Sequence, residues 1–204
     1  MTPAQAAERL PQALAMQDWE TARKALKRLV RADPGNASLH YNLGLVLRRL
    51  GDPDAADDAF GAALKVSPGH LNALFERAAA AMDAGRREAA EAGFSAYLEK
   101  APDDADGWLN LARLCLRRDA AGEAEAAFAR VLALRPSDRD AEIGLAEAGL
   151  RQGRAEAAAK LRTLFTELPA ERPRLLKAMS QGPRGKIPLS GLALTGTVRV
   201  DEAG

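Results

Sequence analysis

Three aspartates close to a glycine are the first residues whose types and spacing could do chemistry. Asp103, Asp104 and Asp106 precede Gly107, and an oxygen-rich run of this kind suggests a calcium-binding loop. Such a loop would need a ligand two positions before Asp104 and a bidentate acid six positions after Gly107. A proline and an arginine occupy those positions, so no metal site is predicted and helix capping accounts for the aspartates.

The other reactive side chains form no catalytic set. Cys115 occupies a place that apolar residues fill elsewhere in the chain, and reactive thiolates need an electropositive, accessible setting, so we predict a buried structural thiol. His40 and His70 are widely separated in the sequence, and no motif supplies either with a serine, cysteine or acid partner. The sequence contains no glycine-rich phosphate loop. We therefore predict that the protein is not an enzyme and uses no cofactor.

The composition argues against a nucleic-acid partner and against disorder. The 29 Lys and Arg residues nearly balance the 28 Asp and Glu residues, whereas nucleic-acid binding usually needs a basic excess or stripe. Hydrophobic residues make up 47% of the chain, which is enough to bury a core. Aromatic residues make up only 4% and alanine is abundant, a composition that favours stacked helices over a sheet.

Several features predict a cytoplasmic protein. A single cysteine cannot form an internal disulfide, which favours a reducing compartment. Glu8 and Arg9 interrupt the region where a signal peptide would need an unbroken apolar core, so no export signal is expected. No apolar run approaches the length of a membrane span, roughly 18–20 residues.

The elements that must position these side chains are indicated by a repeat. An alanine, a phenylalanine or leucine, and a proline return in the same order along the chain: Ala22, Leu26 and Pro34; Ala56, Phe60 and Pro68; Ala90, Phe94 and Pro102; Ala124, Phe128 and Pro136. The position numbers of the four prolines show that the interval between them is constant. A fixed period of about 34 residues is typical of stacked structural repeats.

Residues 37–70 display the repeating unit most clearly. A first helix begins after Asn36, whose side chain can accept a backbone N–H of the first turn, and it ends at Gly51. A second helix starts at Pro53, where the missing N–H costs nothing, and it ends near Pro68. Apolar residues recur at spacings of three and four in both segments, so each repeat is predicted to be an antiparallel helix pair.

The pattern W-x2-L-(G/A)-x2-apolar, followed by A-x3-F and P, resembles the tetratricopeptide repeat. The residues that carry the resemblance are Trp108, Leu111, Ala112, Cys115, Ala124, Phe128 and Pro136, and, with His40 in place of the tryptophan, Leu43, Gly44, Ala56, Phe60 and Pro68. The resemblance covers residues 3 to about 169. It implies an all-α fold, a right-handed superhelical solenoid of antiparallel helix pairs with about five repeats.

The expected solenoid spans residues 1–181. Its repeats fall near 3–36, 37–70, 71–104, 105–138 and 139–169, followed by a capping helix at 170–181 and a tail at 182–204. Leu175, Leu176 and Met179 are expected on one face of the capping helix. The tail loses the helical period, and either a strand or disorder is compatible with its composition.

Three positions depart from the repeat pattern. Pro11 lies inside the first helix of repeat 3–36 and is expected to break or kink it. Asp119 stands where the other turns have glycine, which makes that turn atypical. The last second helix is one residue short and aligns only with a deletion near Glu156.

The resemblance also implies a concave groove formed by the first helix of each repeat. Its expected residues are Tyr41, Asn42, Leu45, Arg48, Arg49, Phe75, Met82, Leu109, Asn110, Arg113, Arg117 and Arg151, with Ile143 and Leu150 at the corresponding places of the last repeat. The apolar members would be buried by a ligand, and Arg48, Arg113 and Arg117 would orient a carboxylate by charge-assisted bonds.

These features predict a non-catalytic adaptor or scaffold that binds a peptide or helix of a partner protein in the groove. Two alternatives stay open at this point. The repeats or the tail could assemble a homo-oligomer or complete a larger structure, with the tail adding a strand to a partner sheet. The chain could also be an accessory subunit that targets a separate enzyme, in a bacterium with a GC-rich genome.

Overall fold

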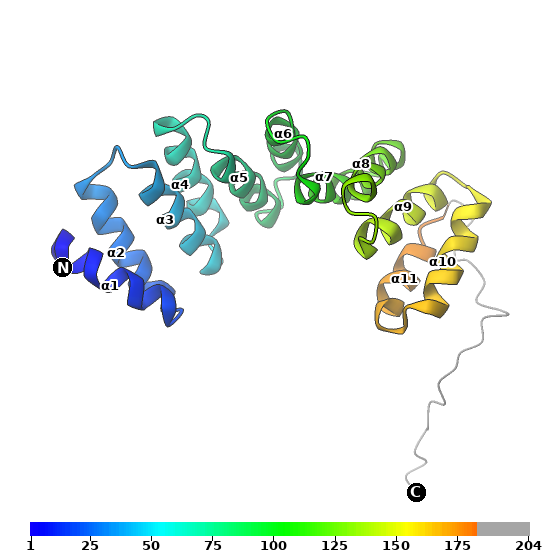
Figure 1. Cartoon of the computed structure of the whole chain (residues 1–204), viewed down its shortest axis with the longest axis horizontal. Coiled ribbons are helices and arrows are strands. Elements are labelled where there is room, and N and C mark those ends of the chain that lie inside the picture. The colour runs from blue at the N-terminus through cyan, green and yellow to red at the C-terminus, as the bar shows by residue number, and fades with distance from the viewer. Residues whose placement is uncertain (183–204) are drawn as a thin grey trace, which may run out of the picture. The chain divides into compact units, whose positions relative to one another are not determined.

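The computed structural model describes residues 1–182, and the helices within them divide into two compact units, Met1–Gly107 and the part from Trp108 onward (Figure 1). The helices are α1 (Pro3–Ala15), α2 (Trp19–Ala32), α3 (Ala37–Arg49), α4 (Pro53–Val66), α5 (Leu71–Asp83), α6 (Arg87–Leu98), α7 (Ala105–Arg117), α8 (Ala121–Leu134), α9 (Arg139–Arg151), α10 (Ala155–Glu167) and α11 (Arg172–Met179). A 3-10 turn at Pro169–Glu171 precedes α11. No strand occurs within residues 1–182.

The helices follow the repeat period of the sequence. The odd-numbered helices from α1 to α9 begin exactly one period apart, and so do the even-numbered helices from α2 to α10. Within unit 1, α1 packs against α2, α3 against α4 and α5 against α6. Within unit 2, α9 packs against α8, α10 and α11. The predicted all-α fold of antiparallel helix pairs is therefore confirmed.

The turn inside each helix pair has one residue in the left-handed conformation. The φ angles are 55° at Gln17, 76° at Gly51, 73° at Gly85, 63° at Asp119 and 78° at Gly153. Glycine adopts this conformation without steric cost, whereas other residues do so at a cost. Asp119 therefore makes the same turn as the glycines, and the turn expected to be atypical keeps the common backbone.

Pro11 does not break α1, which runs continuously from Pro3 to Ala15. A proline inside a helix leaves the carbonyl four residues earlier without its donor, here the carbonyl of Ala7. Ala7 and Pro11 are both exposed, so water can hydrate that carbonyl. The helix is also capped, because Thr2 and Gln5 form a reciprocal capping box.

Side chains cap several first helices, and Asn36 and Asp104 do so at the predicted positions. Asn36 Oδ1 accepts the N–H of Leu39 over 3.3 Å, and Asp138 Oδ1 accepts the N–H of Ala141 over 2.9 Å. Asp104 Oδ1 accepts two backbone N–H groups at the start of α7, at 2.8 and 3.0 Å. Capping therefore accounts for Asp104, as predicted from the sequence.

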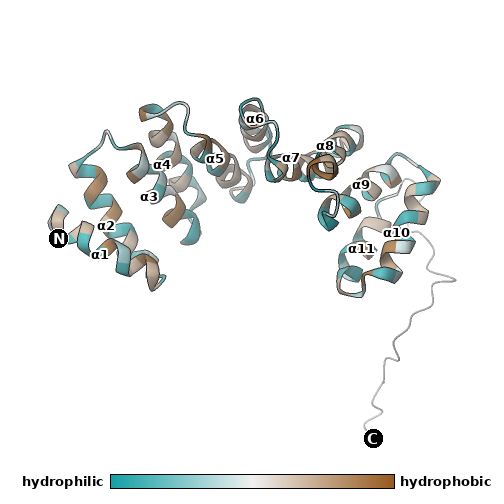
Figure 2. Ribbon diagram, viewed as in Figure 1, coloured by the Kyte–Doolittle hydropathy of each residue, from teal (hydrophilic) through white to brown (hydrophobic). Residues whose placement is uncertain are grey.

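The core of each unit is formed by alanines, larger aliphatic residues and phenylalanines on facing helices. Each helix carries both apolar and polar stretches (Figure 2). Phe60, Phe94 and Phe128 of the second helices are completely or almost completely buried. In α10 the buried residues are Ala157, Leu161, Leu164 and Phe165. Ala157 and Leu161 lie one position earlier than the repeat period predicts from Ala124 and Phe128. This shift agrees with the predicted deletion near Glu156.

Two of the three residues predicted to share one face of the capping helix α11 are buried, and the third is not. Leu175 and Met179 are buried together with Ala178, whereas Leu176 is 43% exposed. The spacing of three and four along this helix is satisfied by Leu175, Ala178 and Met179, so Leu176 turns outward. Almost all of the tail predicted at 182–204 lies outside the described residues.

Candidate partner-binding site

The expected groove residues of the first unit lie on α3 and α5, two helices that contact each other. Asn42 and Arg49 are exposed, and the other members are partly exposed. We call this set the first-helix face of unit 1: Tyr41, Asn42, Leu45, Arg48, Arg49, Phe75 and Met82. Its apolar members keep solvent-accessible area, as a binding surface requires.

Arg48 is held by two acids of the next repeat. One of its nitrogens contacts Glu76, and its Nε donates to Asp83 Oδ2 over 2.9 Å. Burial opposes the charge on Arg48, but the bonds to Asp83 and Glu76 outweigh burial and raise its pKa. The carboxylate-orienting role expected for Arg48 is therefore already occupied by two carboxylates of the chain itself.

Two aromatic residues of this face pack on the second helices in the same way. The ring of Tyr41 lies 5.9 Å from the ring of Phe60, and one repeat later the ring of Phe75 lies 5.4 Å from the ring of Phe94. Phe75 also meets Tyr97 edge-on at 5.3 Å. These contacts fix the orientation of both rings before any partner binds.

A cavity of about 300 Å³ opens beside these rings. It is lined by Tyr41, Asn72, Phe75, Glu76, Tyr97, Asp104 and Asp106. Tyr97 Oη donates to Asp104 Oδ2 over 2.6 Å. Burial, this hydrogen bond and the charges of Asp104 and Asp106 raise the pKa of Tyr97 to about 12. The cavity combines aromatic walls with carboxylates.

The predicted arginines of unit 2 are mostly engaged. Arg113 contacts Asp140, and Arg151 contacts Glu147 over 2.6 Å. Arg117 is exposed. Two of the three arginines predicted for the groove in this unit are thus paired within the chain, as Arg48 is in unit 1.

Helix α11 covers part of the corresponding face of α9. Ile143 is fully buried and Leu150 is 7% exposed, and both belong to one apolar cluster with Leu175 of α11. Arg174 of α11 adds a contact to Asp140. The apolar side chains expected in the groove at this place therefore stabilise the end of the unit by packing against α11.

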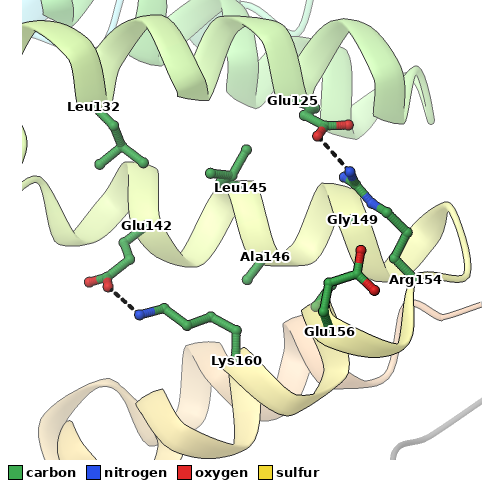
Figure 3. Close-up of a pocket in the computed structure, with 10 residues that line it drawn as sticks. Glu125, Leu132, Glu142, Leu145, Ala146, Gly149, Arg154, Glu156 and Lys160 are labelled. Atoms are coloured by element: carbon green, nitrogen blue, oxygen red, sulfur yellow. Dashed lines mark ion pairs between the residues drawn. The ribbon is translucent and has the colours of Figure 1, made fainter.

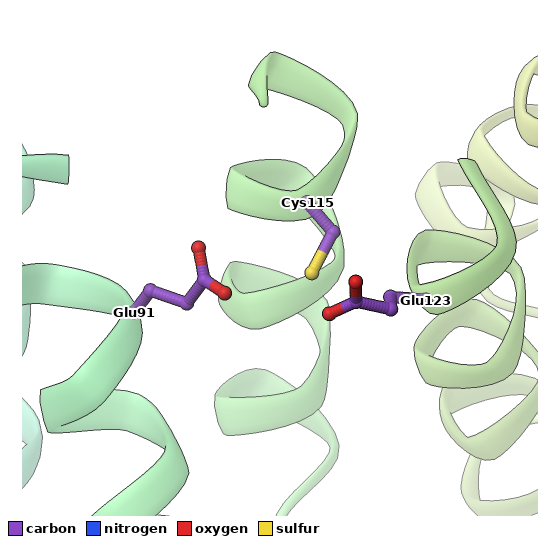
Figure 4. Close-up of side chains that lie close together, drawn as sticks. All are labelled: Glu91, Cys115 and Glu123. Carbon is purple, nitrogen blue, oxygen red and sulfur yellow. The ribbon is translucent and has the colours of Figure 1, made fainter. Parts of the chain in front are cut away.

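Side chains of α7 differ in exposure. Leu109 is 8% exposed and offers little surface to a partner, whereas Asn110 is partly exposed. Cys115 is 2% exposed, which confirms the predicted buried thiol. Its Sγ lies within 4.8 Å of a carboxylate oxygen of Glu123 on α8, and Figure 4 also draws Glu91, which belongs to unit 1.

A second kind of cavity recurs in both units, over a first helix and between the second helices that flank it. The cavity of unit 1 has about 330 Å³ and that of unit 2 about 380 Å³. Ion pairs of 2.7 Å join Glu125 to Arg154 and Glu142 to Lys160 at the unit 2 cavity (Figure 3). Its apolar floor includes Leu145. These cavities are lined by a first helix together with the second helices on either side of it, and none of the residues of the first-helix face of unit 1 lines them.

Comparison with known families follows the repeat pattern. A family model described as tetratricopeptide repeat matches residues 11–70 and 121–162, half of the chain, and a second model with the same description matches residues 47–114. The chain belongs to the tetratricopeptide repeat family. No curated protein gives a significant match to this tetratricopeptide repeat protein.

Solved structures share the fold at low sequence identity. A tetratricopeptide repeat protein from Parabacteroides merdae is 22% identical, with a TM-score of 0.77, over 88% of this chain and 74% of that chain. MamA from Desulfovibrio magneticus RS-1 is 21% identical, with a TM-score of 0.74, over 83% and 96%. YrrB, described as a TPR protein with an unusual peptide-binding site, is 17% identical, with a TM-score of 0.72, over 83% and 87%.

Sequence reasoning assigned part of the unit 1 cavity to other roles. Asp104 was expected only to cap a helix, and Tyr97 was not among the predicted groove residues. Asn72 and Asp106 occupy the same place in successive repeats, each at the second position of a first helix. That periodicity is the sequence signal that could have added both residues to the candidate site.

None of the helices within residues 1–182 combines the length and the apolar character that crossing a membrane requires.

Proposed function

We propose that this tetratricopeptide repeat protein is a non-catalytic interaction module that holds a segment of a partner protein on the first-helix face of unit 1. The observation that carries the proposal is the accessible apolar surface of Leu45, Phe75 and Met82, of which Phe75 also lines the 300 Å³ cavity. Fixed aromatic rings and exposed polar neighbours give such a face both burial and specificity. A cytoplasmic location is part of the same proposal.

The state of unit 2 supports this choice of face. Ile143 and Leu150 are covered by α11, and Arg113 and Arg151 are paired with acids of the chain. A partner would have to displace these contacts to use the same helices of unit 2. On the first-helix face of unit 1, Leu45, Phe75 and Met82 are partly exposed, whereas Leu109, Ile143 and Leu150 of unit 2 are buried.

A peptide or helix is the partner class that the fold favours. Main-chain and side-chain recognition along neighbouring helices suits a segment that presents anchors at regular spacing. The YrrB structure, with its peptide-binding site, is a related fold for which a peptide ligand is named.

Affinity capture with a matched pair of variants tests the proposal. Leu45→Glu places a charge on the first-helix face, whereas Val66→Glu changes an exposed apolar residue of α4 outside that face. Proteins captured from native lysate by the wild type are identified by mass spectrometry, and binding of each purified candidate is measured by calorimetry. We expect affinity to fall about tenfold or more with Leu45→Glu and to remain with Val66→Glu.

Equal capture by both variants, or no capture at all, would refute binding at this face. Light scattering on the purified chain tests the alternative role in assembly. A homo-oligomer that Leu45→Glu dissociates would mean that the face binds a second copy of the chain rather than another protein.

A further inference from the structure

Helix α1 carries an apolar stripe on its exposed side. Its residues Ala6 and Ala13 are buried, and the helix packs against α2. Ala7, Pro11 and Leu14 are all exposed, and Leu14 is 39% exposed. Spacings of four and three residues place these three side chains on one line along the helix. We call Ala7, Pro11 and Leu14 the α1 stripe.

The α1 stripe continues the first-helix face of unit 1. Its members precede Tyr41, Leu45 and Arg48 by one repeat period. Helices α1 and α3 both pack against α2 (Figure 1), and both contribute residues to one apolar cluster. Arg48 is paired with carboxylates of α5. The α1 stripe and its counterparts on α3 therefore form an apolar surface whose only charged member is already paired within the chain.

Two unpaired charges flank this surface. Glu8 follows the first residue of the α1 stripe, and Arg49 is the last residue of α3. Both are exposed, and neither forms an ion pair with any residue in the described range 1–182. In the repeat, Glu8 corresponds to Asn42, seven residues before Arg49, so the two charges are about two turns apart, roughly 10 Å along the helix direction. A partner with one acid and one base at this separation would complement both.

A backbone acceptor lies beside Glu8. Pro11 has no N–H, so the carbonyl of Ala7 lacks the donor that a helix normally supplies. Because Ala7 is exposed, a donor from outside the helix can bond to this carbonyl. A lysine or arginine that pairs with Glu8 can donate to the Ala7 carbonyl as well, which favours a base at this place.

We propose that the partner segment is an amphipathic helix that lies along α1 and α3, with an acid in its first turn at Arg49 and a lysine or arginine in its last turn at Glu8. Such a helix runs antiparallel to α3, because Arg49 lies at the C-terminus of α3. The inference deepens the proposed function and rests on it, because the surface includes Tyr41 and Leu45 of the first-helix face of unit 1.

A helix suits this surface better than an extended segment does. Stripes with spacings of three and four residues accept apolar side chains with the same spacings on a third helix. An extended segment turns alternate side chains away from the surface. An acid in the first turn and a base in the last turn also stabilise the partner helix through its dipole. In the opposite orientation the acid would meet Glu8 and the base would meet Arg49, and both contacts would be repulsive.

Two designed peptides test the inference on the full chain. Each has about 18 residues, leucines spaced three and four residues apart, and a hydrocarbon staple on its polar side that fixes the helix. The first peptide has glutamates in its first turn and lysines in its last turn, and the second peptide exchanges these two turns. Circular dichroism checks that both are equally helical, and calorimetry measures binding. We expect the first peptide to bind about tenfold more tightly, because the exchange turns two attractive ion pairs into repulsive ones.

Variants of the chain assign the preference to the proposed contacts. The double variant Glu8→Lys with Arg49→Glu changes only exposed residues and should reverse the preference, so that the second peptide binds more tightly. Asp58→Asn, at an exposed carboxylate of α4, should leave the preference unchanged. Binding of neither peptide, equal affinity for the two, or a preference that the double variant does not reverse would overturn the inference.

The contribution of α1 is measured with a pair of matched apolar residues. Leu14→Glu should weaken binding of the first peptide about tenfold. Val66→Glu, at an α4 residue of similar exposure outside the surface, should leave binding unchanged. A homo-oligomer that forms without peptide and that Leu14→Glu dissociates would mean that a second copy of the chain occupies the surface, and it would also overturn the inference.

The capture experiment separates the inference from the function beneath it. A purified partner whose binding is weakened by both Leu45→Glu and Leu14→Glu, and that binds through a helix, supports both. A partner that Leu45→Glu weakens and Leu14→Glu does not would overturn the extension onto α1 and leave the proposed function standing. If the first peptide binds as expected but no protein is captured, the helix-binding surface stands and the proposed function fails.

Discussion

Gly44 of α3 lies against the ring of Phe60 of α4 so closely that a methyl group on Gly44 would lie 2.5 Å from Phe60 Cε1. Phe60 is fully buried and cannot move into solvent. The close approach explains why the repeat has a small residue at this place, which alanine occupies in later repeats at Ala78 and Ala112.

Gly44→Ala is therefore expected to destabilise unit 1. The added methyl group overpacks the contact with Phe60, which costs about 1–3 kcal/mol in a rigid core and exceeds the gain in helix propensity. Urea unfolding followed by circular dichroism measures the change in the free energy of unfolding.

Gly61→Ala is the matched control for that substitution. Gly61 also lies inside a helix, α4, but the nearest atom to an added methyl group is 3.7 Å away, in the side chain of Arg77. Helix propensity then dominates, and we expect a gain of up to about 1 kcal/mol. A loss of stability with Gly61→Ala as large as with Gly44→Ala would contradict the steric explanation.

Phe94→Ala is expected to lower the free energy of unfolding by about 3–5 kcal/mol, because Phe94 is fully buried and its removal leaves a cavity. Its ring also supports Phe75 of the first-helix face at 5.4 Å. Calorimetric or urea unfolding measures the loss. A change below about 1 kcal/mol would mean that the core around Phe94 is not packed as the structure has it.

The fold could be predicted from the sequence because its determinants are local and periodic. Proline, glycine and capping residues such as Asn36 define helix boundaries directly, and they return with the repeat period. The predicted break at Pro11 does not occur, because the carbonyl that loses its donor lies where water can hydrate it. Leu176 was misjudged because adjacent positions, Leu175 and Leu176, cannot share one face of a helix.

The candidate site was less predictable, because it depends on which side chains meet across repeats. The position of Arg48 was expected, but its pairing with Glu76 and Asp83 depends on the distance between α3 and α5. Ile143 was placed in the groove by its position in the repeat, although α11 buries it. A repeat pattern predicts where each residue lies along its helix. It does not predict which side chain of another helix packs against that residue.

Gln17→Gly is expected to stabilise the protein by about 0.5–1 kcal/mol, because relief of the left-handed strain exceeds the entropy that glycine adds to the unfolded chain. Gln17 has a φ of 55°. Gly51 and Gly85, at the equivalent position in the next two helix pairs, have the same left-handed conformation. The reverse substitution Gly51→Ala should destabilise by about 1 kcal/mol. Thermal unfolding of the two variants compares them, and a destabilised Gln17→Gly would show that this turn carries no strain.

The titration of Tyr97 tests the charge at the cavity. Tyr41→Phe leaves Tyr97 as the only tyrosine, so ultraviolet titration of phenolate reports one group. We expect a pKa of about 12, raised from 10.0 by burial, by the hydrogen bond to Asp104 and by nearby charge. Because the folded pKa lies above the unfolded one, this tyrosine's contribution to stability is complete below pH 10.0 and is lost as pH rises through about 12.

Asp104→Asn in that background separates charge from burial. Asparagine still caps α7, but it removes the negative charge beside the phenol, so the pKa should fall while remaining above 10.0 because burial persists. Asp103→Asn is the matched control, since Asp103 is the adjacent exposed carboxylate and does not line the cavity. An equal fall in both variants would mean that Tyr97 responds to the general charge of this turn and not to the bond with Asp104.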